Sequence, residues 1–361
     1  ADACPHRGAS MFFGRNEEDG LRCVYHGWKF DLTGACVDMP NEPAESNFKH
    51  KIRATAYPCA DWGGLIWVYM GPSDLQPGLP QFEWCTVPDS HRHVARWQQD
   101  CNYMQALEGC IDTSHVSFVH RSLTPSNLAR RVVRDVGRTD HAPVLTVQET
   151  DYGFAYGGRR NVQGGGYYWR VTQFLLPDWS LIAAPSYPAI GHVWIPRDDH
   201  SIWVYLYAWD ADKPFPDRVR ELYRQGTTGI PRMVLGTHEP FATLQNDYTI
   251  DRQLQKTGNY TGIVNGREQD MAVVDSMGPI MDRSQEFLGT TDVIIVQARK
   301  HLLAGIQAIQ EGREPEHVIR DEKQNDMSEL VVKSEVIPVD RDHHTFWKEK
   351  NPRDPALVPG E

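Results

Sequence analysis

The chain has 361 residues, of which 40% are hydrophobic and 24% charged, the proportions of an ordinary globular protein. Its length exceeds that of one typical domain, so we expect two. The formal net charge of −11 argues against nucleic acid or an anionic membrane as a partner. Because no apolar run approaches the ~18 residues of a membrane helix and no signal-peptide pattern is present, we expect a cytoplasmic protein.

Two short Cys/His turns near the start offer metal ligands. They are Cys4-x-His6 and Cys23-x-x-His26, and each provides one thiolate and one imidazole. A Rieske [2Fe-2S] cluster needs this mixed set, because two cysteines hold one of its irons and two histidines hold the other. A structural zinc ion accepts the same donors, but zinc fingers usually pair cysteine with cysteine and histidine with histidine. The turns therefore favour an electron-carrying Rieske centre.

The segment around these turns is predicted to be a small antiparallel β domain. Residues 27–70 alternate β-rich runs with turns. The stretch 73–80 contains Pro and Gly and is the expected linker, so we place a first domain at 1–78 and a second at 79–361. The chain begins a few residues before its first ligand turn, and we expect further strands upstream. The cysteines outside the ligand turns are irregularly spaced and are expected to be free thiols.

The second domain is predicted to combine helices with an antiparallel sheet. Residues 100–115 have apolar side chains at i, i+3 and i+7, as in a helix. From 144 to 210, aromatic and β-branched runs alternate with turns, which predicts antiparallel strands. A further helix is expected from Thr291, as its cap, to about Gly312. The predicted fold class is therefore α+β.

Polar residues that could bind a second metal lie at the end of the first predicted helix. Asp112 and His115 are three residues apart, which puts both on one face of a helix, and Glu108 joins them one turn earlier. His120 follows His115 by five residues, so the helix must bend, widen or end there if both bind one metal. Two histidines and one carboxylate form the facial triad of non-haem Fe(II) oxygenases, which leaves positions open for O2. The alternative is that these are ordinary polar residues of a surface helix. Because the chain carries a predicted electron source upstream, we favour the metal site.

Residues 101–120, CNYMQALEGCIDTSHVSFVH, resemble the catalytic helix of the Rieske non-haem iron oxygenases, which hydroxylate aromatic rings, and especially their phthalate dioxygenase branch. Residues 246–253 and 268–280 agree, and the similarity spans essentially the whole chain. Rieske proteins of respiratory chains carry an extra cysteine in each ligand loop, where this chain has Ala9 and Tyr25. The resemblance implies a Rieske β domain followed by a catalytic domain with a helix-covered antiparallel sheet of helix-grip type, and two cofactors, a [2Fe-2S] Rieske cluster and a mononuclear Fe(II).

The resemblance also implies which residues hold the second iron. His115 and His120 would be its histidine ligands, and the carboxylate ligand would come from far downstream, at Asp270. Asp275 and Asp282 compete with Asp270 because they are close to it in the sequence. For all three the alternative is an acidic residue that caps a helix.

The resemblance gives Asp112 a role other than that of a metal ligand. The resemblance implies that its carboxylate links His26 of the partner subunit to the iron ligand His115, so that electrons cross a subunit boundary. The physics agrees, because a ligating histidine usually gives its second N–H to a carboxylate. Such a link requires a cyclic oligomer with head-to-tail contacts, a homotrimer or stacked trimers.

The branch that the chain resembles oxidises aromatic carboxylates such as phthalates and chlorobenzoates. A guanidinium binds a carboxylate through two parallel hydrogen bonds, so we expect a buried arginine that faces the iron. Arg170, central in an aromatic strand, is the first candidate, followed by Arg160 and Arg138. For each of them a surface position is the alternative.

The leading hypothesis is a terminal oxygenase that takes electrons from an NADH-dependent flavin/iron-sulfur reductase, activates O2 and cis-dihydroxylates a small aromatic carboxylate. The nearest alternative inserts one oxygen atom, as a hydroxylase or O-demethylase. A pure electron-transfer Rieske protein and a structural zinc module are two further alternatives.

Overall fold

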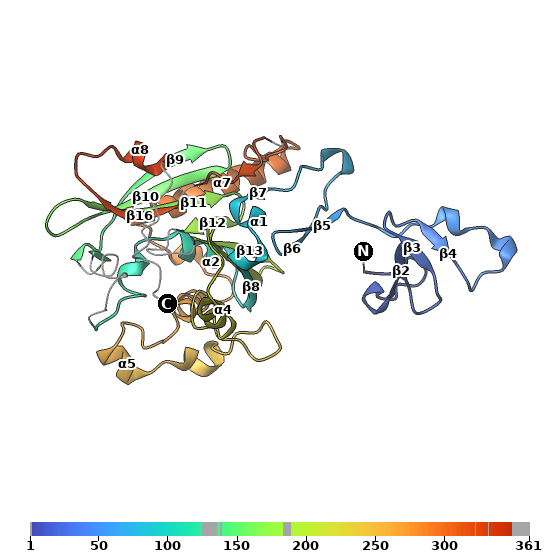
Figure 1. Cartoon of the computed structure of the whole chain (residues 1–361), viewed down its shortest axis with the longest axis horizontal. Coiled ribbons are helices and arrows are strands. Elements are labelled where there is room, and N and C mark those ends of the chain that lie inside the picture. Colours follow the sequence, from blue (N-terminus) through green and yellow to red (C-terminus); the bar gives the residue numbers. More distant parts are fainter. Residues whose placement is uncertain are drawn as a thin grey trace. The chain divides into compact units, whose positions relative to one another are not determined.

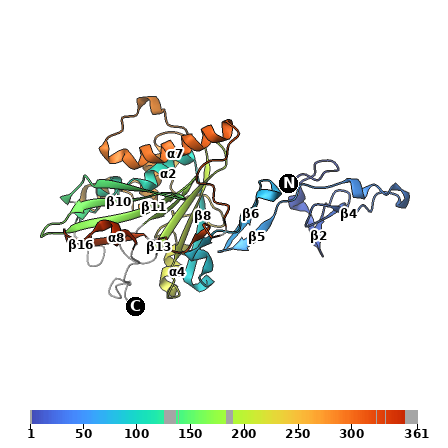
Figure 2. The same cartoon turned by 90° about the horizontal axis from the view of Figure 1, so that it is seen from above.

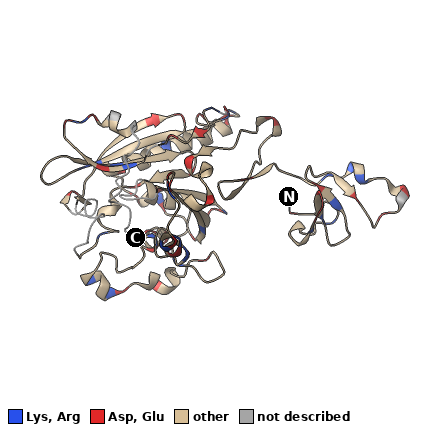
Figure 3. Cartoon of the chain, viewed as in Figure 1, with Lys and Arg blue, Asp and Glu red and all other residues tan. Residues whose placement is uncertain are grey.

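The computed structural model describes residues 2–124, 136–137, 139–182, 189–321, 323–330 and 332–348. The chain forms two compact units, Ala1–Gln76 and Pro77–Glu361 (Figure 1). Acidic and basic residues are interspersed along both units, so the net charge of −11 does not come from one acidic segment (Figure 3). Among the described residues, no helix combines the length and the apolar character that crossing a membrane requires.

The first unit is built from short antiparallel strands. A four-stranded sheet follows chain order, and a separate two-stranded hairpin comes after it. Trp28 and Phe30 pack with Met11 in a small core that also contains Cys4 and Cys23. The sheet comprises β1 (Arg15–Glu17), β2 (Gly20–Arg22), β3 (Lys29–Asp31) and β4 (Cys36–Asp38), and the hairpin comprises β5 (Cys59–Trp62) and β6 (Leu65–Val68).

The second unit is organised around a large antiparallel sheet in the order β8-β14-β13-β12-β11-β10-β9, with β16 paired to β11. The predicted strands between 144 and 210 are confirmed, and the glycine run 164–166 lies in the hairpin loop between β10 and β11. The strands are β8 (Arg92–Gln99), β9 (Val144–Thr150), β10 (Gly153–Asn161), β11 (Tyr167–Leu175), β12 (Trp179–Ile182), β13 (Ala189–Pro196), β14 (Ile202–Trp209) and β16 (Lys333–Ile337); the short β7 (Gln81–Phe82) and β15 (Asp326–Met327) pair with each other.

Helices cover both faces of this sheet. In Figure 2, α2 (Tyr103–Ile111) and α7 (Val293–Gln310) lie on one face and α8 (His343–Lys348) on the other. Because side chains alternate along a strand, Phe154, Phe174 and Trp194 point to the face that packs against α2, α6 (Gly266–Asp275) and α7. Trp169 and Val171 point to the opposite face and pack with residues of α8. The α+β prediction is therefore confirmed, and α7 begins at Val293, two residues after the predicted cap.

Among the described residues, the remaining α-helices are short. They are α1 (Glu83–Thr86), α4 (Asp217–Arg224) and α5 (Arg252–Thr257). A tight turn, η7 (Leu244–Thr249), leads into α5 and has left-handed backbone at Asp247 and Tyr248.

Candidate metal centres

The two Cys/His turns of the first unit have matching backbone geometry. The N–H of Gly8 donates to the carbonyl of Cys4 at 2.8 Å, and the N–H of Gly27 donates to the carbonyl of Cys23 at 3.0 Å. Both glycines have positive φ, 77° and 79°, a conformation that glycine adopts without steric cost. The same turn is therefore built twice, and each copy presents one cysteine and one histidine.

The four side chains of these turns converge. Cys4 and Cys23 are buried, and their side chains are within hydrogen-bonding reach of each other. The rings of His6 and His26 meet edge to face, with centroids 4.5 Å apart. The Nδ1 atom of His6 is buried and has no hydrogen-bond partner among the described residues, and such an atom calls for a ligand. Two thiols and two imidazoles in one place fit a Rieske cluster, which transfers single electrons when bound.

The helix before the second candidate centre ends earlier than the sequence pattern predicts. α2 ends at Ile111, and Asp112 is its C-cap residue with extended backbone, φ −67° and ψ 122°. The carboxylate of Asp112 accepts hydrogen bonds from the backbone N–H groups of Ser114 (2.6 Å) and His115 (3.1 Å). Such bonds compete with helical ones. The prediction that Asp112 and His115 share a helix face is therefore wrong. The helix ends before both histidines, so the regular helix through His115 and His120 that would keep them apart is absent from this described segment.

Glu108 does not join this group either. Its carboxylate accepts from Arg299 (Nε to Oε1, 2.7 Å) and from Arg283 (Nη1 to Oε2, 3.0 Å). Arg299 also pairs with Glu286. Glu108 is thus one member of a partly buried ion-pair network that ties α2 to α7, and its predicted place beside Asp112 is wrong.

Three side chains form the second candidate centre. Asp270 Oδ1 lies 3.0 Å from His120 Nε2 and 3.7 Å from His115 Nε2. One ligand atom from each residue lies within 4.8 Å of the others. The histidines come from the segment after α2 and the aspartate from α6, so the site is assembled from positions about 150 residues apart in the chain. Two histidines and one carboxylate are the donor set of a non-haem iron site.

The electrostatics of the three residues suit a cation. Burial alone would raise the pKa of Asp270, but His120 and Arg267 outweigh it, so its pKa lies below the usual value. Burial would lower the pKa of His120, and the Asp270 carboxylate raises it instead. A divalent ion would take the place of the proton that His120 and Asp270 share, because metal binding requires an ionised carboxylate and neutral imidazoles.

Gln269 and Arg267 orient two of the three candidate ligands, and no pattern in the sequence pointed to them. The Nδ1 of His120 is 2.8 Å from Oε1 of Gln269, whose Nε2 donates to the carbonyl of Ile263 at 2.7 Å. Since the Gln269 oxygen only accepts, His120 carries its proton on Nδ1 and turns Nε2 toward Asp270. Arg267 donates to Asp270 Oδ2 at 3.2 Å. No spacing rule separates Gln269 and Arg267 from other polar residues of a helix.

The other carboxylates have different contacts. Asp112 Oδ2 lies 3.4 Å from His115 Nδ1, and both side chains are 20% exposed. Burial opposes ionisation of Asp112, but the hydrogen bond and charge of His115 lower its pKa. Asp275 accepts from Gln99 at 2.8 Å and from Tyr248. Asp282 caps the short turn η8 (Arg283–Gln285). Of the three competing aspartates, Asp270 is the one beside the histidines.

Comparisons with known proteins agree with this architecture. Residues 1–58 match the family model described as "Rieske [2Fe-2S] domain" and residues 68–355 match "LigXa C-terminal domain like". The chain is 37% identical over 327 residues, 84% of its length, to the 3-chlorobenzoate-3,4-dioxygenase oxygenase subunit of Comamonas testosteroni, of which it covers 74%. It is 37% identical to the phthalate 4,5-dioxygenase oxygenase subunit of Pseudomonas putida over 86% of its length and 72% of that protein. The chain belongs to the Rieske oxygenases.

The family assignment extends to the fold and the cofactors. The oxygenase superposes on dicamba monooxygenase with a TM-score of 0.57, over 86% of each chain and at 17% identity, which is evidence for the fold alone. The predicted Rieske cluster and mononuclear iron are confirmed by the matched Rieske domain together with the His115, His120 and Asp270 group.

The predicted substrate arginines differ in their surroundings. Arg160 on β10 is buried and donates through Nη2 to the carbonyl of Thr113 at 2.6 Å, while its Nε has no partner in the described part of the oxygenase. Burial lowers its pKa, and the neighbouring charge of Arg170 lowers it further. Arg170 on β11 is partly buried. Arg138 lies outside the described residues.

Proposed function

We propose that this chain is the terminal oxygenase of a multicomponent system that cis-dihydroxylates a small aromatic carboxylate of the phthalate or chlorobenzoate type. Cys4, His6, Cys23 and His26 would hold the cluster. His115, His120 and Asp270 would hold the Fe(II). When bound, the cluster would supply single electrons and the iron would supply the chemistry that activates O2. An NADH-dependent flavin/iron-sulfur reductase would supply the electrons that balance the insertion of both oxygen atoms.

The observation that carries this proposal is an uncompensated guanidinium near the metal-ligand group. In the ranges that the structure describes, the side chain of Arg170 makes no hydrogen bond or ion pair. It acts electrostatically on Tyr156 and on Cys110, and Cys110 also feels the charge of Asp270. A partly buried cation without a partner is costly, so such a group usually pairs with an anion.

The atoms around Arg170 also suit an oxygen-rich ligand. Arg160 Nε and Thr113 Oγ1 are buried and have no partner in the described part of the chain. An aromatic carboxylate would satisfy these donors with its oxygens and Arg170 with two parallel hydrogen bonds. The two relatives at 37% identity are named for 3-chlorobenzoate and phthalate, both aromatic carboxylates.

Electron delivery is proposed to run through Asp112. Its carboxylate already approaches His115 Nδ1 at 3.4 Å, and the same carboxylate could accept from His26 of the partner subunit in a homotrimer or in stacked trimers. Such a link orients both histidines through their second N–H groups. We expect Asp112→Asn to keep both metal centres and to lose most of the turnover.

Labelled oxygen tests the reaction. The purified oxygenase, loaded with Fe(II), is supplied with a reductase, NADH, 18O2 and a panel of phthalates, chlorobenzoates and their neutral amides. We expect two labelled atoms in the product and turnover of carboxylates only. Product with one labelled atom would instead indicate the alternative reaction, hydroxylation or O-demethylation. Absence of any oxidised product across the panel would contradict the proposal.

A further inference from the structure

The two oxygens of the Asp270 carboxylate face different partners. Oδ1 is the oxygen near the imidazoles, 3.0 Å from His120 Nε2 and 3.7 Å from His115 Nε2. Oδ2 lies 3.2 Å from Nη1 of Arg267, one turn earlier on α6. Residues three apart on a helix are neighbours on its surface. One oxygen is therefore left for a metal and the other is already bonded.

Arg267 is itself fixed by the sheet. Its Nη2 lies 2.7 Å from Nε2 of His192 on β13, and its guanidinium lies 5.7 Å from the ring of Trp97 on β8. Because a guanidinium only donates, His192 accepts at Nε2 and carries its proton on Nδ1, which is 3.9 Å from Cys110 Sγ. His192 is 1% exposed, so the acceptor is held by packing. The guanidinium thus bridges the carboxylate and the sheet.

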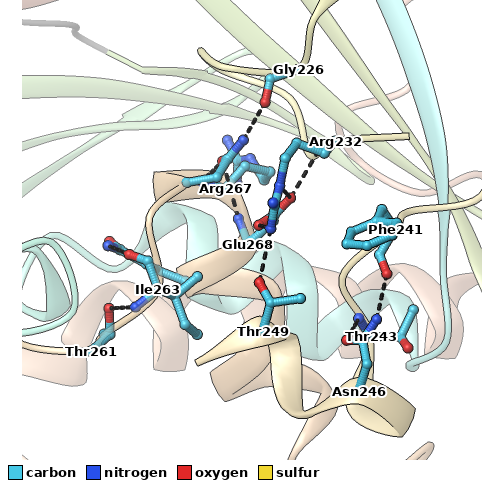
Figure 4. Close-up of polar contacts among 12 residues, drawn as sticks. Gly226, Arg232, Phe241, Thr243, Asn246, Thr249, Thr261, Ile263, Arg267 and Glu268 are labelled. Atoms are coloured by element: carbon cyan, nitrogen blue, oxygen red, sulfur yellow. Dashed lines mark hydrogen bonds and ion pairs between the residues drawn. The ribbon is translucent and has the colours of Figure 1, made fainter. Parts of the chain in front are cut away.

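The first turn of α6 is anchored independently of the Arg267 side chain. Asn265 caps it by accepting from the N–H groups of Arg267 and Glu268, and Glu268 is held by Arg232 (Figure 4). Gln269 is held by the carbonyl of Ile263. Removal of the Arg267 side chain should therefore free the Asp270 carboxylate without displacing the helix that carries it.

We propose that Arg267 is a positioning residue that restricts Asp270 to binding the second metal through one oxygen. Carboxylates bind metals through one or both oxygens. Binding through both takes one more coordination position and closes one of those that a two-histidine, one-carboxylate site leaves open. By holding Oδ2, Arg267 keeps that position free for O2 or substrate. The inference rests on the proposed function, since it takes Asp270 as a ligand.

Crystal structures of the oxygenase with Co(II) in the second site test this directly. In the unmodified protein and in Arg267→Lys, which keeps a charged donor, one Co–O distance to Asp270 should be about 2.1 Å and the other clearly longer. In Arg267→Gln both oxygens should bind. Two-oxygen binding in the unmodified protein, or one-oxygen binding in Arg267→Gln, would overturn the inference. Cobalt bound away from His115, His120 and Asp270 would instead overturn the proposed metal site.

A solution titration gives a second readout. Arg267→Gln removes a positive charge beside the metal and frees a second ligand atom, so we expect this variant to bind Co(II) about tenfold more tightly. If Arg267 only supported the ligands, its removal should instead weaken metal binding by about tenfold or more. Arg267→Lys should stay close to the unmodified protein. The matched control is Arg313→Gln, an exposed arginine that pairs with Glu311, with unchanged affinity expected. Weaker binding in Arg267→Gln would show a merely structural role and contradict the inference.

Discussion

The buried ion pair at the start of α6 gives a sharp prediction about stability. The side chain of Glu268 is fully buried, and Arg232 surrounds it: the backbone N–H and Nε donate to Oε1 at 3.0 and 2.9 Å, and Nη2 donates to Oε2 at 2.8 Å. Arg232 Nη2 also donates to Thr249 Oγ1 at 2.9 Å (Figure 4). One arginine therefore joins α6 to two loops.

Arg232→Met would leave the Glu268 carboxylate buried with only a backbone donor. Removal of one partner of a buried ion pair costs about 3–5 kcal/mol. Since the Arg232 side chain is 38% exposed, water can reach part of the vacated space, so we expect the lower end, about 3 kcal/mol. In a domain of this size that corresponds to a fall in Tm of roughly 6–10 °C.

Urea unfolding and calorimetry, at constant metal content, measure the effect. Arg224→Met is the matched control, because Arg224 is 64% exposed and pairs with Glu221 on the surface, where the loss should stay below about 1 kcal/mol. Glu268→Gln added to Arg232→Met removes the unpaired charge and should restore part of the stability. If Arg232→Met is no more destabilising than Arg224→Met, the reasoning about the buried charge is wrong.

Three further predictions concern pH, substrate and metal. Burial raises the pKa of Asp178 to about 7 from an ordinary 3.8. The folded state therefore binds the carboxyl proton more tightly than the unfolded state does. The stability that this protonation contributes at low pH is lost as the pH rises through about 7. Asp178→Asn should therefore raise the free energy of unfolding at pH 8 by up to about 4 kcal/mol and change it little at pH 4, as urea titrations at both pH values would show; an equal effect at both would contradict this. Arg170→Gln should raise KM for a carboxylate substrate by roughly 30-fold, about 2 kcal/mol for a lost charged hydrogen bond, and leave binding of the neutral amide unchanged; parallel losses would place Arg170 outside the substrate site. Asp270→Ala should lose the second iron in metal analysis and keep the Rieske absorption spectrum, and retention of full iron would exclude Asp270 as a ligand.

Local patterns were sufficient for part of the molecule. The Cys4 and Cys23 turns are each closed within five residues, so their spacing and their glycines predicted a Rieske centre that the matched family model confirms. The strands from 144 to 210 were predictable because aromatic and β-branched runs bounded by turns suit a pleated, half-buried surface. The end of α2 was not, since the predicted helix extended to residue 115. Only the hydrogen bonds that the Asp112 carboxylate accepts from Ser114 and His115 show where the helix stops.

The candidate iron site needed more than local patterns. Asp270 is about 150 residues from the histidines, and on sequence grounds Asp275 and Asp282 were comparable. The fold separates them by contact: Asp270 faces His120, whereas Asp275 is bonded to Gln99 and Tyr248. Likewise Glu108, which a helical wheel would place near Asp112, forms an ion pair with Arg299 of α7.

The sequence by itself determined the ligand turns of the first unit, the alternation of strands in the second and the family of the chain, because these depend on neighbours within one turn or one strand. Only the tertiary structure shows that Asp270, which the resemblance implied, meets the histidines, that Gln269 and Arg267 contact two of the candidate ligands, and that the side chain of Arg170 has no anionic partner in the described ranges. The physical reason is that a metal site joins side chains from distant segments. Their approach is set by the packing of α2 and α6 against the sheet, which no local spacing records.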